Sequence, residues 1–178
     1  PGGTAQLLGN WEYRDGADGL ERAADWAAGA GLDAWAIERE VLDPARYAET
    51  WIRDGGTRAG SPEFERLCAL WLDDFARRGV TGVGFGYLVL RRPDGAPRLR
   101  RTERAAAALD GVAGLGAHLA AALAARDAVA AAGDAELLRM RPRVAGDVTE
   151  ERSHWPGAGD PSVILLRQGG GLRRELRV

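Results

Sequence analysis

Asn10, Trp11 and Glu12 are the first residues in the chain whose types and position suggest chemistry. The run before them, Thr4 to Leu8, is mostly apolar and has no helical period, which predicts a buried strand. Ligands of open parallel sheets bind beyond the carboxyl ends of the strands. All three residues are therefore candidates for substrate binding, with Trp11 stacking on a flat base or side chain. The alternative, a Trp that closes the sheet edge beside an Asn in a turn, is equally compatible with the sequence.

Arginines are concentrated between residues 91 and 104, and this stretch is the second candidate site. Guanidinium groups match the geometry of phosphates, so the stretch could bind a nucleic acid. The alternative is a solvated hairpin edge whose charges discourage strand pairing. The formal net charge of −2 gives no general sign of nucleic-acid binding and favours this alternative. The candidate nucleic-acid-binding residues are Arg91, Arg92, Arg98, Arg100 and Arg101.

The sequence gives little support for a metal site, a nucleophilic cysteine or a phosphate-binding glycine loop. His118 is predicted in an Ala-rich helix and His154 in a charged loop, and neither has another His or Cys at ligand spacing. Cys68 lies on the apolar stripe of a predicted helix and is interpreted as a small core residue. The spaced glycines at 82–86 lie inside a predicted strand rather than in a turn that opens a helix. We therefore predict no metal ligand and no cofactor-binding residue, and we assign no catalytic residue.

The elements that must position these candidates alternate along the first hundred residues. The spacing of Asp18 and Glu21 predicts a capping box that opens a helix, and Asp43-Pro44 and Ser61-Pro62 predict two further helix starts. Residues 33–41 and 80–92 are predicted as strands. In the second strand the glycines share one face, which allows a helix backbone or a ligand to approach closely, and helix packing is the favoured interpretation.

The composition changes near residues 102–105, where an Ala-rich helical segment begins. A short helix from Asp134 and a C-terminal hairpin, residues 162–168 and 172–178, follow. We therefore predict two parts: residues 1–104, and an accessory α+β segment of residues 105–178 that ends in the hairpin.

Composition places the chain among soluble proteins. It has 178 residues, of which 46% are hydrophobic and 28% charged, and no apolar run approaches the roughly 20 residues of a membrane span. All 24 basic residues are arginine, and the single cysteine suits a reducing cytoplasm, which is the predicted location. No Met or signal peptide precedes Pro1 and the chain closes on a strand, so we predict a fragment of a longer protein.

Several segments resemble one family. Pro1-Gly2-Gly3, the apolar strand after it and the Asn-Trp-Glu sequence at 10–12 look like the fifth strand of class I S-adenosylmethionine-dependent methyltransferases. The match is to the small-domain group that methylates nucleic acids and protein glutamines. Similar segments follow at 33–40, 43–49 and 82–87 and, more weakly, at 160–163 and 167–169. The predicted strands at 33–41 and 80–92, with two predicted helices between them, also resemble the final antiparallel pair of strands in the family's sheet.

The resemblance implies both a fold and a function. The expected fold is α/β, the C-terminal part of a Rossmann-like methyltransferase sheet with partly antiparallel last strands and a smaller α+β extension. The parent protein would transfer a methyl group from S-adenosylmethionine to a nucleic-acid base or a protein glutamine. The family's glycine-rich cofactor loop and Asn-Pro-Pro-aromatic catalytic motif occur nowhere in this sequence. We therefore expect this chain alone to bind no cofactor and to be inactive.

The alternative function is a non-catalytic module that binds a nucleic acid or a protein partner through the Arg91–Arg104 stretch. The two interpretations place the site on different residues. The first places the site near Asn10 and Trp11, and the second places it on the arginines.

Overall fold

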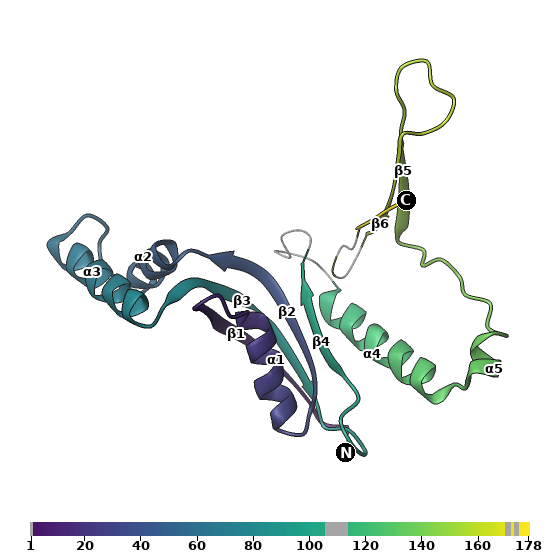
Figure 1. The fold of residues 1–178 in the computed structure, drawn as a ribbon, viewed down its shortest axis with the longest axis horizontal. Helices are drawn as coiled ribbons and strands as arrows, with labels where there is room; N and C mark the ends of the chain where they lie inside the picture. Colours follow the sequence, from purple (N-terminus) through teal and green to yellow (C-terminus); the bar gives the residue numbers. More distant parts are fainter. Residues whose placement is uncertain (1, 106–113, 170–171, 173–174) are drawn as a thin grey trace. The chain divides into compact units, whose positions relative to one another are not determined.

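The structure, a computed structural model, describes residues 2–105, 114–169, 172 and 175–178. It divides into two compact units, Pro1–Arg104 and Ala105–Val178 (Figure 1). The elements of unit 1 are, in order, β1 (Thr4–Arg14), α1 (Gly19–Gly29), β2 (Asp33–Leu42), α2 (Pro44–Asp54), α3 (Pro62–Arg77), β3 (Val80–Arg91) and β4 (Arg100–Arg104).

Unit 1 is built on one mixed sheet of four strands in the order β1-β3-β2-β4. Strand β3 is antiparallel to both of its neighbours, whereas β2 and β4 are parallel. Strands β1 and β2 therefore run in the same direction with β3 between them. Helix α1 connects these two strands and packs across the sheet, where it contacts all four strands (Figure 1). The predicted α/β class is thus confirmed at the level of a mixed α/β unit.

The predicted helix starts are confirmed because each depends on local hydrogen bonds. The Asp18 carboxylate accepts from two backbone N–H groups in the first turn of α1, at 2.9 and 3.3 Å. Asp43 and Ser61 cap α2 and α3 in the same way. The side chain of Glu21 does not complete the expected capping box and instead accepts a hydrogen bond from the Thr102 hydroxyl at 2.6 Å.

Strand β1 differs from its prediction in length and in burial. It continues to Arg14, so Asn10, Trp11 and Glu12 lie inside the strand rather than beyond its carboxyl end. The residues from Thr4 to Leu8 are exposed, because β1 forms the edge of the sheet and has a neighbouring strand on one side only. The prediction of a buried strand is therefore wrong for the first half of β1.

The glycine face of β3 receives side chains and backbone from the neighbouring strands. A Cβ atom at Gly84 would overlap the indole nitrogen of Trp11 and the carboxylate of Glu38. A Cβ atom at Gly86 would overlap the backbone carbonyl of Ile37. The favoured interpretation of close helix packing is wrong here, because strands rather than a helix fill the space.

Strand β4 was not predicted from the sequence. The chain does not return beside β3 as a hairpin; it crosses to the far side of β2 and pairs with it in parallel, with Arg100 opposite Ala34. A parallel pair must be joined by a crossover, and this strand is short and rich in charge. Its sequence therefore lacks the apolar alternation that would have identified it.

Asp33 holds this crossover in place from within the sheet. Its Oδ1 atom accepts from the backbone N–H groups of Arg98 and Leu99 at 2.8 and 2.9 Å. Its Oδ2 atom accepts from the Arg91 guanidinium at 2.8 Å. Burial alone would raise the pKa of Asp33, but these hydrogen bonds outweigh it and hold the pKa below its ordinary value.

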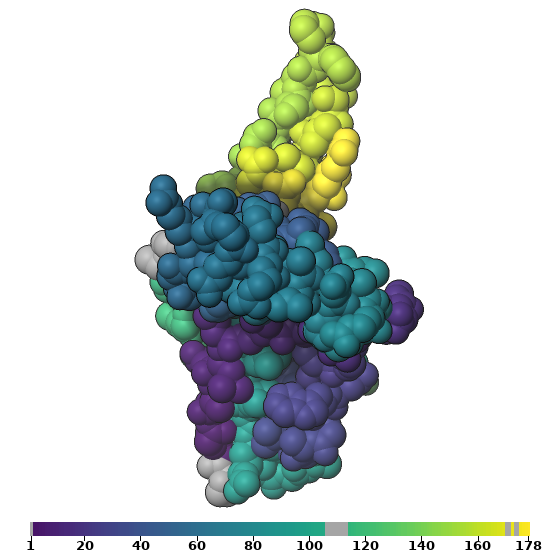
Figure 2. All heavy atoms as spheres, turned by 90° about the vertical axis from the view of Figure 1, so that its left-hand side faces the viewer, coloured from purple at the N-terminus to yellow at the C-terminus, as the bar shows by residue number. Residues whose placement is uncertain are grey.

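Helices α2 and α3 share an aromatic core with the start of β3. The ring centroids of Tyr47, Trp71 and Phe75 lie 5.8 to 6.2 Å apart. Cys68 packs against the same cluster of buried residues. In the space-filling view the two helices form one continuous block (Figure 2).

The described residues of unit 2 form two helices and one antiparallel sheet. Its elements are α4 (Leu115–Ala131), α5 (Asp134–Leu137), β5 (Val148–Ser153), β6 (Val163–Gln168) and β7 (Glu175–Arg177). The pairing of β6 with β7 confirms the C-terminal hairpin, whose predicted glycine turn lies partly outside the described residues. Strand β5 was not predicted, because its sequence is almost entirely polar; antiparallel pairing with β6 holds it in the sheet.

Candidate functional site

A groove of about 470 Å³ lies beside the second half of β1. Its main lining residues are Asn10, Trp11 and Glu12 from β1, Arg22 and Trp26 from α1, and Tyr47 from α2. The volume falls within the range of roughly 300–1,000 Å³ that is usual for small-molecule sites. The structure thus brings the three candidate substrate-binding residues together at one groove.

One wall of the groove is a polar pair that joins β1 to α2. The side-chain amide of Asn10 donates a hydrogen bond to the Tyr47 hydroxyl at 2.8 Å. Burial raises the pKa of the Tyr47 phenol, despite the opposing effect of the Asn10 hydrogen bond, so the phenol is neutral. A neutral amide beside a neutral phenol offers both donors and acceptors to the polar edge of a base or an amide.

Trp11 lines the groove but is almost entirely buried. Its side chain is only 6% exposed and packs with Leu20 and Ala24 of α1. The indole N–H donates to the Glu38 carboxylate at 2.7 Å. Trp11 therefore offers little ring surface for the stacking that its sequence position suggested.

Trp26 is the exposed aromatic residue at this groove, and the sequence analysis did not single it out. It is 74% exposed and lies one helical turn after Arg22, which also lines the groove. The sequence could have indicated this residue, because Trp26 lies outside the apolar face of α1. That buried face is formed by Leu20, Ala24 and Ala27. A large aromatic side chain on the solvent face of a helix is a candidate for ligand contact.

Glu12 is held in ion pairs at the end of the groove. Its carboxylate accepts from Arg78 and from Arg14, each at 2.6 Å, and its backbone carbonyl accepts from Arg22. Burial would raise the pKa of Glu12, but the two guanidinium groups outweigh it and lower the pKa. A carboxylate with a lowered pKa is a poor proton acceptor, so Glu12 is suited to orienting Arg14 and Arg78 rather than to general-base chemistry.

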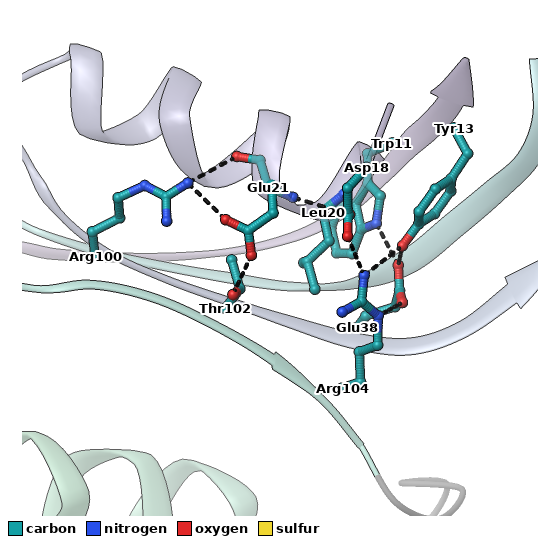
Figure 3. A network of polar contacts seen from close by, with 9 residues as sticks. All are labelled: Trp11, Tyr13, Asp18, Leu20, Glu21, Glu38, Arg100, Thr102 and Arg104. Carbon is teal, nitrogen blue, oxygen red and sulfur yellow. Dashed lines mark hydrogen bonds and ion pairs between the residues drawn. The ribbon is translucent and has the colours of Figure 1, made fainter. Parts of the chain in front are cut away.

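A buried carboxylate of β2 accepts hydrogen bonds from Trp11, which lines the groove, and from its neighbours (Figure 3). Glu38 of β2 is 3% exposed, and its Oε2 atom accepts from the Trp11 indole and from the Tyr13 hydroxyl, at 2.7 and 2.5 Å. Its Oε1 atom accepts from Arg104 Nε at 3.1 Å. Burial and the hydrogen bond to Glu38 together raise the pKa of Tyr13 to about 12.

The candidate nucleic-acid-binding arginines lie on β3, on β4 and in the connection between them. Arg92 and Arg98 are exposed in that connection. Three of the candidates form ion pairs with carboxylates: Arg91 with Asp33, Arg100 with Glu21 and Asp25, and Arg101 with Glu103. Arg101 also lies over the Trp35 ring, 4.8 Å from its centroid. These partners reduce the positive charge that the stretch presents to a phosphate backbone.

Within the described residues, no group of three or more His, Cys, Asp and Glu side chains is arranged to hold a metal ion. None of the helices in that part of the chain is both long enough and apolar enough to span a membrane.

A scan against protein-family models gave no match to this chain. A search of curated proteins gave no significant match either. The fold and the groove define a mixed α/β protein with a candidate binding site on β1, α1 and α2.

Proposed function

We propose that this chain is the distal part of an S-adenosylmethionine-dependent methyltransferase, and that its groove receives the methyl acceptor. The acceptor would be a nucleic-acid base or a protein glutamine. The observation that carries the proposal is the strand order, in which antiparallel β3 lies between parallel β1 and β2. This arrangement supports the partly antiparallel end of the sheet that the family resemblance implies.

The exposed edge of β1 gives further support. Leu7 and Leu8 are both exposed, and successive side chains of a strand point to opposite faces, so both faces of the sheet are uncovered here. No charged residue interrupts β1 before Glu12. Long, uncharged edge strands are normally paired or covered. In the proposed protein, the preceding part of the sheet pairs with this edge.

The cofactor itself does not fit the residues described here. The glycines at 82–86 lie within β3, and the space beside Gly84 is filled by Trp11 and Glu38. S-adenosylmethionine supplies the methyl group, and we place its binding site outside this chain. The role left to the groove is to bind and orient the acceptor nitrogen, which accelerates transfer by alignment.

Calorimetric titration with S-adenosylhomocysteine tests the proposal. We expect binding to a longer protein that includes this chain, and no binding to residues 1–178 alone. The isolated chain serves as the matched control. Binding by the isolated chain would contradict the location of the cofactor site, and binding by neither protein would contradict the methyltransferase assignment.

Trp26 provides a test of the groove. In the longer protein, Trp26→Ala removes an exposed aromatic surface, so we expect the acceptor KM to rise about tenfold for a base that stacks on it. Affinity for S-adenosylhomocysteine should not change. Trp155→Ala is the matched control, because Trp155 is equally exposed but belongs to unit 2. Equal effects of the two substitutions would argue against the groove as the acceptor site.

A further inference from the structure

We propose that Glu38 is a positioning residue for the groove and acts through Trp11 and Tyr13. The inference rests on the proposed function for the identity of the ligand, although the contacts that carry it do not depend on that function. Glu38 is buried and lines no part of the groove, so it would not touch a ligand itself.

The contact between Glu38 and Trp11 crosses an intervening strand. Glu38 belongs to β2 and Trp11 to β1, and β3 lies between these strands in the sheet. Trp11 lies opposite Gly84 in the register, and a Cβ atom at Gly84 would overlap both the indole nitrogen and the carboxylate. The absence of a side chain at one position of β3 is therefore what allows the two groups to meet.

Because Glu38 is buried, its hydrogen bonds with Trp11 and Tyr13 fix the orientation of those two side chains. A buried carboxylate is costly unless donors satisfy it, and here Trp11, Tyr13 and Arg104 do so. Hydrogen bonds to an ionised group are shorter and stronger than neutral ones. The Tyr13 hydroxyl, whose pKa is raised to about 12, is protonated at neutral pH and donates to the carboxylate. The Glu38 carboxylate of β2 therefore sets the orientation of the Trp11 ring, which lines the groove.

The same carboxylate is linked to the other wall of the groove through Arg104. The Arg104 guanidinium contacts the Asp18 carboxylate at 2.6 Å, and Asp18 caps α1 (Figure 3). Helix α1 carries Arg22 and Trp26. Two of the three elements that line the groove, β1 and α1, are thus tied to Glu38.

A purely stabilising role would predict something different from a positioning role. A stabilising network can be weakened without moving the groove side chains relative to one another. A positioning residue transmits its replacement to those side chains even when the fold persists. Glu38→Gln is the informative change, because it retains the size of the side chain and an acceptor oxygen but removes the charge.

Nuclear magnetic resonance on the isotope-labelled full chain tests this difference directly. The indole N–H signal of Trp11, one of six tryptophans, can be assigned by its loss in Trp11→Phe. In Glu38→Gln we expect this signal to shift and to exchange faster with solvent. We also expect shifts at the Asn10 side-chain amide and the Trp26 indole, which line the groove.

Two further variants complete the experiment. Glu103→Gln is the matched control, because Glu103 is a largely buried carboxylate of β4 that pairs with Arg101, and it should leave the Trp11 and Asn10 signals in place. Arg104→Gln keeps Glu38 but breaks its link to Asp18, and it should shift the Trp26 signal as well as the Trp11 signal. An unchanged Trp11 signal in Glu38→Gln, or a shift confined to Trp11, would overturn the proposal.

In the longer protein, Glu38→Gln should raise the acceptor KM about tenfold, because it displaces the groove side chains that bind the acceptor. An unchanged KM in an active enzyme would also overturn the proposal. If the unmodified longer protein transfers no methyl group, the proposed function fails, and the resonance shifts decide the role of Glu38 independently.

Discussion

Asp33→Ala is expected to lower the free energy of unfolding of unit 1 by about 3 kcal/mol. Asp33 is 2% exposed, and its removal leaves the Arg91 guanidinium and the backbone N–H groups of Arg98 and Leu99 without their acceptor. The expected value is at the low end for a broken buried ion pair, because Arg91 keeps some contact with solvent. Chemical denaturation followed by circular dichroism measures the change.

Asp73→Ala is the matched control, since Asp73 is an exposed aspartate of α3. It should change the stability by about 0.5 kcal/mol or less. A loss for Asp33→Ala no larger than that of the control would show that the carboxylate does not hold the crossover.

The effect of Asp33→Ala also has a defined dependence on pH. The pKa of Asp33 is lower in the folded protein than its ordinary value of 3.8, so the folded state favours the ionised carboxylate. The stability that this group contributes is therefore present above pH 3.8 and is lost as the pH falls through the folded-state pKa. The difference between the original protein and Asp33→Ala should narrow in acid; a difference that widens there would contradict the ion pair.

Gly86→Ala is expected to destabilise unit 1 by about 3 kcal/mol or more. The added Cβ atom would overlap the backbone carbonyl of Ile37, and a backbone atom cannot move aside as the end of a flexible side chain can. Strand β2 has a register irregularity between Glu38 and Glu40, at the point where it passes Gly86. Thermal and chemical denaturation both report the loss.

Gly9→Ala is a close control for this substitution. Gly9 lies directly opposite Gly86 in the register of β1 and β3, and its added Cβ atom would meet only Leu88 Cδ1 at an ordinary contact distance of 3.6 Å. Replacing this glycine should be neutral or slightly stabilising, because alanine reduces the entropy of the unfolded chain. Similar losses at the two positions would mean that close approach is not what requires glycine at Gly86.

Sequence reasoning found part of the candidate site. Asn10 and Glu12 were identified from their place after an apolar run, and both line the groove although they lie within the strand. Trp26 and Glu38 were missed. Trp26 could have been found from its position off the apolar face of α1. Glu38 could not, because its partner Trp11 lies 27 residues away and reaches it across a third strand.

The sequence by itself determined the features that depend on neighbouring residues along the chain. The starts of α1, α2 and α3 follow from side chains that bond the next few backbone N–H groups, and the strand character of β3 follows from its alternating pattern. These interactions span only a few residues, so local types and spacing are sufficient to predict them.

Only the tertiary structure decided which strand lies beside which. The exposure of Leu7 and Leu8, the parallel pairing of β4 with β2 and the meeting of Trp11 with Glu38 all follow from the order β1-β3-β2-β4. That order depends on contacts between residues far apart in sequence, which no local pattern records. The groove is a consequence of the same order, because its walls come from β1, α1 and α2, which long-range packing brings together.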